Sequence, residues 1–312
     1  MKAPERLSAF DLHQWSAQHR ANVENALSNW VAVPAFSHAP KGLVELNDAM
    51  RYAVLGGGKR LRPLLTLAAC EAVVGNSHAA LRSACAVELI HAYSLVHDDM
   101  PCMDNDVLRR GKPTVHVKFG QAQALLTGDA LQALAFELLT PEGDNVDAAM
   151  QARLCRMLAQ AAGGLGMAGG QAIDLASVGL PLNSEQLHAM HRLKTGALLQ
   201  ASVMMGAQCG QPSSAVLQAL SDYGVSIGLA FQVVDDMLDV TADSATLGKT
   251  AGKDAAQDKP TFVSLMGLAA AGDYAQQLLA RAIGGLDALQ SHGLHNTQAL
   301  RALADMLVNR QH

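Results

Sequence analysis

Apolar side chains recur at helical spacing along almost the whole chain, and this periodicity limits the possible folds more than any other feature. Leu43, Leu46, Met50 and Val54 are three or four residues apart, which is typical of one face of an amphipathic helix. No alternating pattern of useful length predicts a strand. The same spacing predicts further helices at 7–31, 78–100, 115–139, 147–167, 184–207, 213–240, 261–285 and 296–310. The sequence therefore predicts an all-α fold of ten or more helices.

Glycine, proline and capping residues mark the expected helix boundaries. Three consecutive glycines at 56–58 should end a helix, because glycine loses the most conformational entropy there. Pro63 should lie in the first turn of the next helix, and Asn183 with Gln186 has the spacing of a capping box. The glycine-rich segment 163–170 either allows close helix contact or breaks a helix beside a cavity. No linker divides the chain, so we expect one domain over residues 1–312 around a central cavity.

Composition excludes several classes of protein. Half of the 312 residues are apolar and 16% are charged, which predicts a sizeable core. A net charge of −5 argues against a nucleic-acid-binding protein, whereas basic clusters at 59–62, 109–112 and 249–259 suit small anionic substrates. The five scattered cysteines predict reduced thiols in the cytoplasm. The polar N-terminus resembles no signal peptide, and no uninterrupted apolar run approaches ~20 residues, so we expect no stable membrane association.

Two aspartate clusters, each directly after an apolar segment, indicate the chemistry. The first contains Asp98, Asp99 and Asp104, and the second contains Asp235 with its near neighbours Asp236 and Asp239. Grouped carboxylates repel one another and are costly to bury unless cations neutralise them. Hard oxygen ligands suit Mg²⁺, which usually bridges protein carboxylates to a substrate's phosphates. Either cluster alone is compatible with a solvated helix end, but the two together predict a Mg²⁺-diphosphate site at the mouth of an apolar cavity.

The two clusters pose different geometric problems. Asp235 and Asp239 are four residues apart and share one helix face, while Asp236 points aside. Asp98 and Asp104 are six residues apart, so a regular helix would place them about 240° apart. The first helix must therefore bulge or end near Pro101 if both carboxylates are to reach one set of metal ions.

Basic and neighbouring residues predict anion binding beside these clusters. The turn at 58–63 places Lys59 and Arg62 three residues apart at a glycine-rich helix start, and taken alone this motif is equally a basic capping turn. His91 lies seven residues before Asp98, on the same face of its helix. Gln171 and Asp174 share a face that points either at the site or elsewhere. Lys249 follows a glycine, but the pattern lacks the glycine of a P-loop and no strand precedes it, so we interpret 243–260 as a lysine-bearing loop.

These motifs together resemble those of the trans-isoprenyl diphosphate synthases, and within them the bacterial farnesyl diphosphate synthases. The resemblance covers nearly the whole chain. It rests on residues 57–63, the two aspartate clusters in this order, 109–114, Lys194-Thr195-Gly196 and Phe231-Gln232. It implies an all-helical fold of the isoprenoid synthase type, a homodimer, and three Mg²⁺ ions between the clusters.

The resemblance also implies a role for each matching residue. Metal ligation falls to Asp98, Asp104 and Asp235, assisted by Asp99 and Asp239. The allylic diphosphate, dimethylallyl or geranyl, would be bound by Arg109, Lys194, Lys249 and Lys259. Isopentenyl diphosphate would be bound by Gly58, Lys59, Arg62, His91 and Arg110. Thr195 and Gln232 would turn oxygen atoms toward the developing allylic cation. The implied product is (2E,6E)-farnesyl diphosphate, with pyrophosphate released at each condensation.

Product length depends on Tyr93 and Ser94, which lie five and four residues before Asp98. On a helix that ends at the metal site, they lie ~6–7.5 Å deeper than the metals. A bulky ring there can form the floor of the cavity, although a helical tyrosine also commonly packs between helices. With a floor at Tyr93, the resemblance favours a C15 product over geranylgeranyl diphosphate.

Other functions leave some of these motifs unexplained. His97-Asp98 suggests a metal phosphohydrolase of the HD type, but that reading does not explain the second cluster or the 57–63 turn. A terpene cyclase would not need a second diphosphate site at Lys59 and Arg62. A non-catalytic partner subunit should have lost aspartates or basic ligands, which this chain retains.

Overall fold

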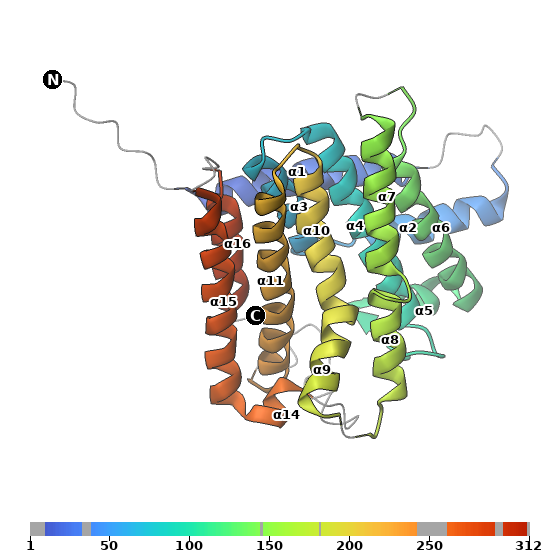
Figure 1. Cartoon of the computed structure of the whole chain (residues 1–312). Coiled ribbons are helices and arrows are strands. Elements are labelled where there is room, and N and C mark those ends of the chain that lie inside the picture. The colour runs from blue at the N-terminus through green and yellow to red at the C-terminus, as the bar shows by residue number, and fades with distance from the viewer. Residues whose placement is uncertain are drawn as a thin grey trace.

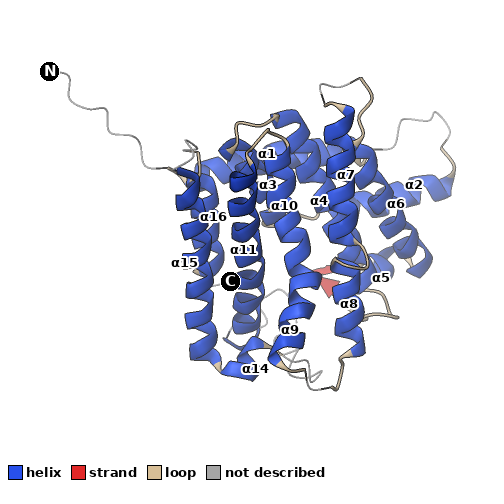
Figure 2. Ribbon diagram, in the orientation of Figure 1, coloured by secondary structure: helices blue, strands red, loops and turns tan. Residues whose placement is uncertain are grey.

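The described part of the chain is almost entirely helical in the computed structural model, which confirms the all-α prediction (Figures 1 and 2). The structure describes residues 10–32, 39–143, 146–180, 182–241, 261–290 and 296–310. The helices are α1 (Leu12–Trp30), α2 (Lys41–Val54), α3 (Leu61–Ala72), α4 (Ser77–Asp98), α5 (Val115–Phe119), α6 (Gln121–Leu139), α7 (Ala148–Ala162), α8 (Met167–Ala176), α9 (Ser184–His191), the π-helical turn η1 (Arg192–Gly196), α10 (Ala197–Gln208), α11 (Ser214–Thr241), α14 (Phe262–Met266), α15 (Leu268–Gln290) and α16 (Gln298–Val308).

Several predicted boundaries are confirmed. α2 ends just before the three glycines, and Pro63 lies in the first turn of α3. The expected capping box is present, since Asn183 accepts from the backbone N–H of Gln186 and the Gln186 side chain accepts from Asn183 N–H. The first helix begins at Leu12, where the side chain of Asp11 accepts a hydrogen bond from Gln14 N–H.

Other predicted segments are divided. The segments 115–139 and 261–285 each contain a glycine, Gly120 (φ 88°) or Gly267 (φ 83°), in a backbone conformation that L-residues rarely adopt. Each glycine ends a five-residue helix and begins a long one. The segment 147–167 is wrong at its C-terminal end, because α7 stops at Ala162 and the chain turns before α8. The glycine-rich segment thus does break the helix.

A short hairpin was not predicted. Strands β1 (Leu108–Arg109) and β2 (Lys112–Pro113) pair antiparallel, with Arg109 opposite Lys112. The connecting residues Arg110 (φ 52°) and Gly111 (φ 73°) both have positive φ, as in a type I′ turn. The strands are too short to produce an alternating pattern, so periodicity could not reveal them.

Two apolar cores share α3 and α10. One core packs residues of α1, α4, α6 and α7 against them, and the other packs residues of α11, α15 and α16. Figure 1 shows α10 between α11 on one side and α7 on the other. This arrangement fixes α4, α8, η1 and α11 around the cavity described below.

Helix α4 runs through the interior. By length and composition it is the one described helix that could cross a membrane, with a mean hydropathy of 1.2, but 67% of that window is buried within the protein. Its apolar character therefore fits a core helix that carries Asp98 at its end.

Candidate active site

A cavity of about 590 Å³ brings most of the predicted site residues together. Side chains of α4, α8, η1, α11 and the loop after α4 line it. Its apolar lining includes Leu95, Met167, Leu175 and Phe231. Its polar lining consists of Arg62, His91, Ser94, His97, Asp98, Asp104, Asp106, Arg109, Gln171, Lys194, Thr195, Gln232 and Asp235. Charged groups and apolar surface thus share one cavity.

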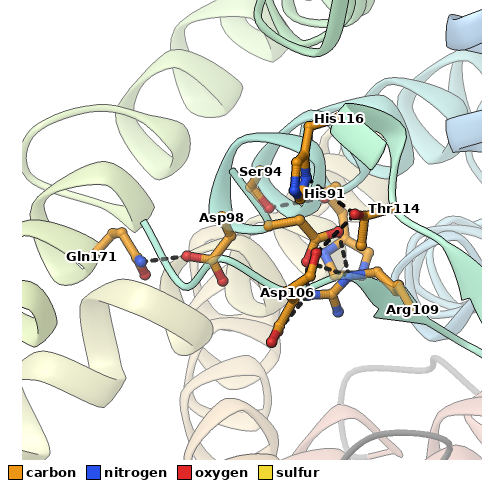
Figure 3. A network of polar contacts seen from close by, with 9 residues as sticks. His91, Ser94, Asp98, Asp106, Arg109, Thr114, His116 and Gln171 are labelled. Atoms are coloured by element: carbon orange, nitrogen blue, oxygen red, sulfur yellow. Dashed lines mark hydrogen bonds and ion pairs between the residues drawn. The ribbon is translucent and has the colours of Figure 1, made fainter. Parts of the chain in front are cut away.

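The first aspartate cluster forms where α4 ends. Asp98 is the last residue of α4, and its carbonyl accepts a hydrogen bond from Asp104 N–H at 2.9 Å. Asn105, with a φ of 51°, continues this turn. The helix therefore ends before Pro101, as the spacing of Asp98 and Asp104 required. The Asp98 carboxylate accepts a hydrogen bond of 2.5 Å from Gln171 Nε2 on α8 (Figure 3).

Asp99 and Arg109 form an ion pair within the same loop. Arg109 Nε lies 2.9 Å from both carboxylate oxygens of Asp99, and its Nη2 lies 2.5 Å from Oδ1. Burial by itself lowers the pKa of Arg109, but these hydrogen bonds raise it above its ordinary value. Asp106 is 4.0 Å from the same guanidinium. Asp99 is buried in this ion pair, so it holds Arg109 in place beside the cavity.

The first cluster has the electrostatic character of a cation site. Burial raises the pKa of Asp98, and the nearby charges of Asp104 and Asp99 add to that effect against Lys194 and Arg109. A bound cation would relieve this destabilised negative charge, and the donors are the hard oxygens that Mg²⁺ prefers. Among the described residues, no three His, Cys, Asp or Glu side chains are grouped closely enough to hold a metal alone. The aspartates therefore fit Mg²⁺ ions that also bind waters and substrate phosphates.

The second cluster lies on α11 and contacts Arg310 near the C-terminus and the start of α14. Asp235 lines the cavity and lies 3.4 Å from the guanidinium of Arg310, which also stacks over the Phe231 ring at 4.4 Å. Asp236 points away, as predicted. Its carboxylate accepts from Phe262 N–H and from Gln232 Nε2, each at 2.8 Å. Only the first residue of the Asp235–Asp236 pair thus faces the cavity.

The π-helical turn η1 places Lys194 and Thr195 at the cavity. Such turns are inserted at functional sites in many proteins. A Cβ on Gly170 of α8 would lie 2.1 Å from Lys194 N, so the glycine allows α8 to approach η1 directly. Segment 163–170 therefore also provides close helix contact. Lys194 Nζ lies 2.5 Å from Asp174 Oδ2, and the Thr195 hydroxyl donates to Gln232 Oε1 at 3.0 Å.

Lys59 of the 57–63 turn lies within electrostatic range of Asp235 in the second aspartate cluster. Burial lowers the pKa of Lys59; the charge of Arg310 lowers it further, and that of Asp235 raises it. Arg62 lines the cavity, and its buried Nε has no hydrogen-bond partner among the described residues. A donor without a partner at this position suits an anion.

His91 lines the cavity, and Arg110 lines a smaller pocket that shares Leu95 and Arg109 with it. The Arg110 guanidinium donates to Gly57 O. Gly58 has a φ of 143°, which L-residues rarely adopt, and a Cβ there would also displace the Arg110 guanidinium, whose Nη1 would lie 2.8 Å away. Burial lowers the pKa of His91 well below its usual value, and the charges of Arg62 and Arg110 contribute. His91 is thus neutral at pH 7 and offers one N–H donor.

Tyr93 and Ser94 line the cavity within α4. The Tyr93 ring meets the His97 ring edge-on at 5.8 Å, and the Ser94 hydroxyl donates to His91 O. His97 itself lies against α6. Its Nε2 is 3.0 Å from Leu125 O, and a Cβ on Gly128 would collide with the ring. His97 Nε2 therefore contacts the backbone of α6, which argues against the metal-ligand role that the HD-type alternative gives this residue.

The sequence analysis did not predict every residue of the site, and two predicted residues lie outside the part of the chain that the structure describes. Arg310 was missed, because nothing in the sequence signals that residue 310 lies beside Asp235. The direction of Gln171 and Asp174 was left open, and both now contact site residues. Lys249 and Lys259 lie outside the described residues.

Comparison with known proteins agrees with this geometry. Residues 44–295 match the family model for polyprenyl synthetase. A probable farnesyl diphosphate synthase of Sinorhizobium fredii is 51% identical over 86% of this chain and 80% of its own length. The large subunit 1 of a heterodimeric geranylgeranyl pyrophosphate synthase from Arabidopsis thaliana is 44% identical over 97% of this chain and 81% of its own length.

A solved structure extends the likeness to the whole fold. Geranyltransferase from Helicobacter pylori, complexed with magnesium and isoprenyl diphosphate, superposes with a TM-score of 0.82. It is 36% identical, and the match covers 98% of both chains. The two aspartate clusters, the basic turn and the helical cavity thus have a common explanation: the chain belongs to the polyprenyl synthetase family.

Proposed function

We propose that the protein is a Mg²⁺-dependent prenyltransferase that condenses isopentenyl diphosphate with dimethylallyl and then geranyl diphosphate. The products are (2E,6E)-farnesyl diphosphate and one pyrophosphate per condensation. The observation that carries this proposal is the convergence of Asp98, Asp104 and Asp235 with basic side chains on one partly apolar cavity. Farnesyl diphosphate synthases among the relatives support the C15 product.

Ionisation of the allylic diphosphate is the first step. The C–O bond breaks, its electron pair leaves with pyrophosphate, and an allylic cation remains. Arg109 and Lys194 line the cavity, where their charges favour the departing anion; Lys249 and Lys259 would add to this. Asp98, Asp104 and Asp235 would hold Mg²⁺, which when bound neutralises the leaving group. We propose three ions, as in the family.

The second substrate supplies the electrons for the new C–C bond. Lys59, Arg62, His91 and Arg110, with the backbone of Gly58, would hold the diphosphate of isopentenyl diphosphate so that its double bond meets the cation. The hydroxyl of Thr195 and the amide oxygen of Gln232 lie at the cavity and would stabilise developing positive charge. Apolar neighbours exclude water, and pyrophosphate takes the proton that restores the allylic double bond.

A product assay tests this function. Purified protein is incubated with Mg²⁺, dimethylallyl diphosphate and isopentenyl diphosphate, and the carbon number of the products is determined. We expect mainly C15. Mainly C20 would support geranylgeranyl diphosphate synthase, the second candidate, which the Arabidopsis relative favours. Release of phosphate or pyrophosphate without isopentenyl diphosphate, and without any prenyl product, would contradict both.

Replacement of Tyr93 tests the proposed cavity floor. Tyr93→Ala should open the cavity below the ring and shift the main product from C15 toward C20 or longer. Ser94→Phe, one residue nearer to Asp98, should block the tail and shift products toward C10. Chromatography of the dephosphorylated products measures both shifts. An active Tyr93→Ala enzyme with unchanged products would show that Tyr93 merely packs between helices.

Further properties form part of the proposal. We propose one domain over residues 1–312, in the cytoplasm, without stable membrane association or nucleic-acid binding. We also propose a homodimer. Exposed apolar side chains on α5, α6 and the β1–β2 hairpin support it, among them Leu125 and Leu126, which are 49% and 50% exposed. Sedimentation equilibrium of the purified protein tests the oligomeric state.

A further inference from the structure

Arg60 lies within the basic 57–63 turn but faces the interior. The residue is only 4% exposed, whereas its neighbour Lys59 is exposed and Arg62 lines the cavity. Its guanidinium makes three short hydrogen bonds: Nε to Glu24 Oε1 at 2.7 Å, Nη1 to Glu88 Oε1 at 2.6 Å, and Nη2 to Val54 O at 2.7 Å. These contacts join the turn to α1, to α4 and to the end of α2.

The backbone at Arg60 adopts a conformation that an L-residue rarely chooses. Its φ of 51° and ψ of 36° are left-handed, and it precedes the first residue of α3 without a side-chain cap. This conformation disfavours an arginine relative to glycine. The ion pairs with Glu24 and with the buried Glu88 therefore hold the turn in a shape that its own backbone preference opposes.

Glu88 connects this network to the diphosphate side of the cavity. It is buried on α4, three residues before His91, so the two side chains lie on the same face of that helix. Burial lowers the pKa of Arg62 and of Arg110, and the charge of Glu88 opposes that effect in both. One buried carboxylate thus lies within range of three arginines, of which only Arg60 is bonded to it.

We propose that Arg60, with Glu24 and Glu88, is a positioning site that fixes the 57–63 turn so that Lys59 and Arg62 present their charges to isopentenyl diphosphate. Arg60 itself does not touch the substrate. The inference rests on the proposed function, since it deepens the role of the turn in that reaction. It differs from a purely structural role because it predicts a defect confined to one of the two substrates.

Glu24→Gln is the most informative variant. The Glu24 side chain is 36% exposed, so its neutralisation weakens the hold on Arg60 without leaving a deeply buried charge alone. We expect the KM for isopentenyl diphosphate to rise about three- to tenfold, while the KM for geranyl diphosphate and kcat change less than about twofold. Glu45→Gln is the matched control: it removes a charge from the Lys41 ion pair on α2, at a similar exposure of 44%, and should change neither KM.

A second variant guards against loss of folding. Arg60→Gly with Glu88→Gln removes the buried ion pair, and glycine accepts the left-handed backbone, so the pair of changes should fold better than Arg60→Ala. Circular dichroism checks the fold. We expect a larger rise in the KM for isopentenyl diphosphate than in Glu24→Gln. Equal rises for both substrates, or a lower melting temperature with unchanged KM values in folded variants, would overturn the inference.

Binding without turnover separates this inference from the proposed function. Titration calorimetry with isopentenyl diphosphate, in the absence of allylic substrate, should show weaker binding to Glu24→Gln than to the wild type or Glu45→Gln. A wild type that binds isopentenyl diphosphate but forms no prenyl product would contradict the proposed function alone. A wild type that forms product, with Glu24→Gln binding as tightly as the control, would contradict the positioning role alone.

Discussion

The two aspartate clusters share one arrangement, but different contacts hold each of them. In each, the second residue of an Asp-Asp pair is buried and bonded, Asp99 to Arg109 and Asp236 to Phe262 N–H. In each, the first residue lines the cavity. In the first cluster the buried residue is held locally, because Asp99 follows the helix end and its partner Arg109 is ten residues away. The second lies within a continuous helix and depends on α14 and on Arg310, far away in the sequence. Different contacts thus yield the same division into one carboxylate that lines the cavity and one that is buried.

Removing the cavity-facing carboxylates should have the largest effect. Asp98→Ala and Asp235→Ala should each lower kcat by about 10²-fold or more, because charge stabilisation of the leaving group is lost. The fold should survive, since a carboxylate crowded by like charges without metal is unfavourable. Steady-state rates at saturating Mg²⁺ measure this. Near-normal turnover in Asp235→Ala would mean that the second cluster holds no metal, and the comparison would fail.

Low pH should reduce folding stability through a buried histidine that packs against Phe262, next to the second cluster. His191 of α9 stacks on Phe262 at 5.3 Å, and burial lowers its pKa to about 4. The unfolded chain, with a pKa near 6.5, binds the proton more readily, so stability falls as pH drops from about 6.5 to 4. His191 should account for about 3 kcal/mol of this loss.

The difference between wild type and His191→Phe isolates that contribution. Burial raises the pKa values of Asp98 and Asp99, which favours folding as the pH falls, but both proteins share that effect. Urea unfolding at pH 7 and pH 4 should therefore show a smaller acid loss in the variant. Identical losses would exclude His191 as the acid-sensitive group.

The anchored carboxylates should differ in their contribution to stability. Asp236→Ala leaves the buried Phe262 N–H without its acceptor, which should lower the free energy of unfolding by about 1–3 kcal/mol. Asp99→Ala should cost less, because the partly exposed guanidinium of Arg109 can turn toward Asp106 and water. Urea unfolding of both variants measures the difference. A larger loss of unfolding free energy in Asp99→Ala than in Asp236→Ala would show that the local contact of Asp99 contributes more to stability than the long-range contact of Asp236.

The smallest effect is expected at Arg310. Its ion pair with Asp235 is long and partly solvated, so Arg310→Ala should lower the free energy of unfolding by less than about 1 kcal/mol. Because a competing cation is removed, the Mg²⁺ concentration for half-maximal rate should fall by about twofold. A rise in that concentration would show that Arg310 assists metal binding instead.

Sequence reasoning predicted the parts of the molecule that depend on local pattern. Helix periodicity, the glycine stop at 56–58, the capping box at Asn183 and the turn after Asp98 all follow from neighbouring residues. The motifs also included most of the side chains that share the cavity. Contacts between distant residues left no such signal. Neither the inward turn of Arg60 nor the approach of Arg310 to Asp235 can be derived from spacing, because each depends on how separate helices pack.

The extra residue in η1 changes which residues of α9 and of α10 face the neighbouring helices. A π turn holds one residue more than an α turn, so the helix that follows is rotated by about 100° against the helix that precedes it. α9 can therefore direct His188 and His191 toward Phe262, while α10 buries Leu198 and Leu199 in the two cores. Deleting one residue here would restore regular hydrogen bonding but put these two faces out of phase. The irregular turn thus sets the rotation between the helix that makes the aromatic contact and the helix that packs in the cores. Lys194 and Thr195 lie within this turn.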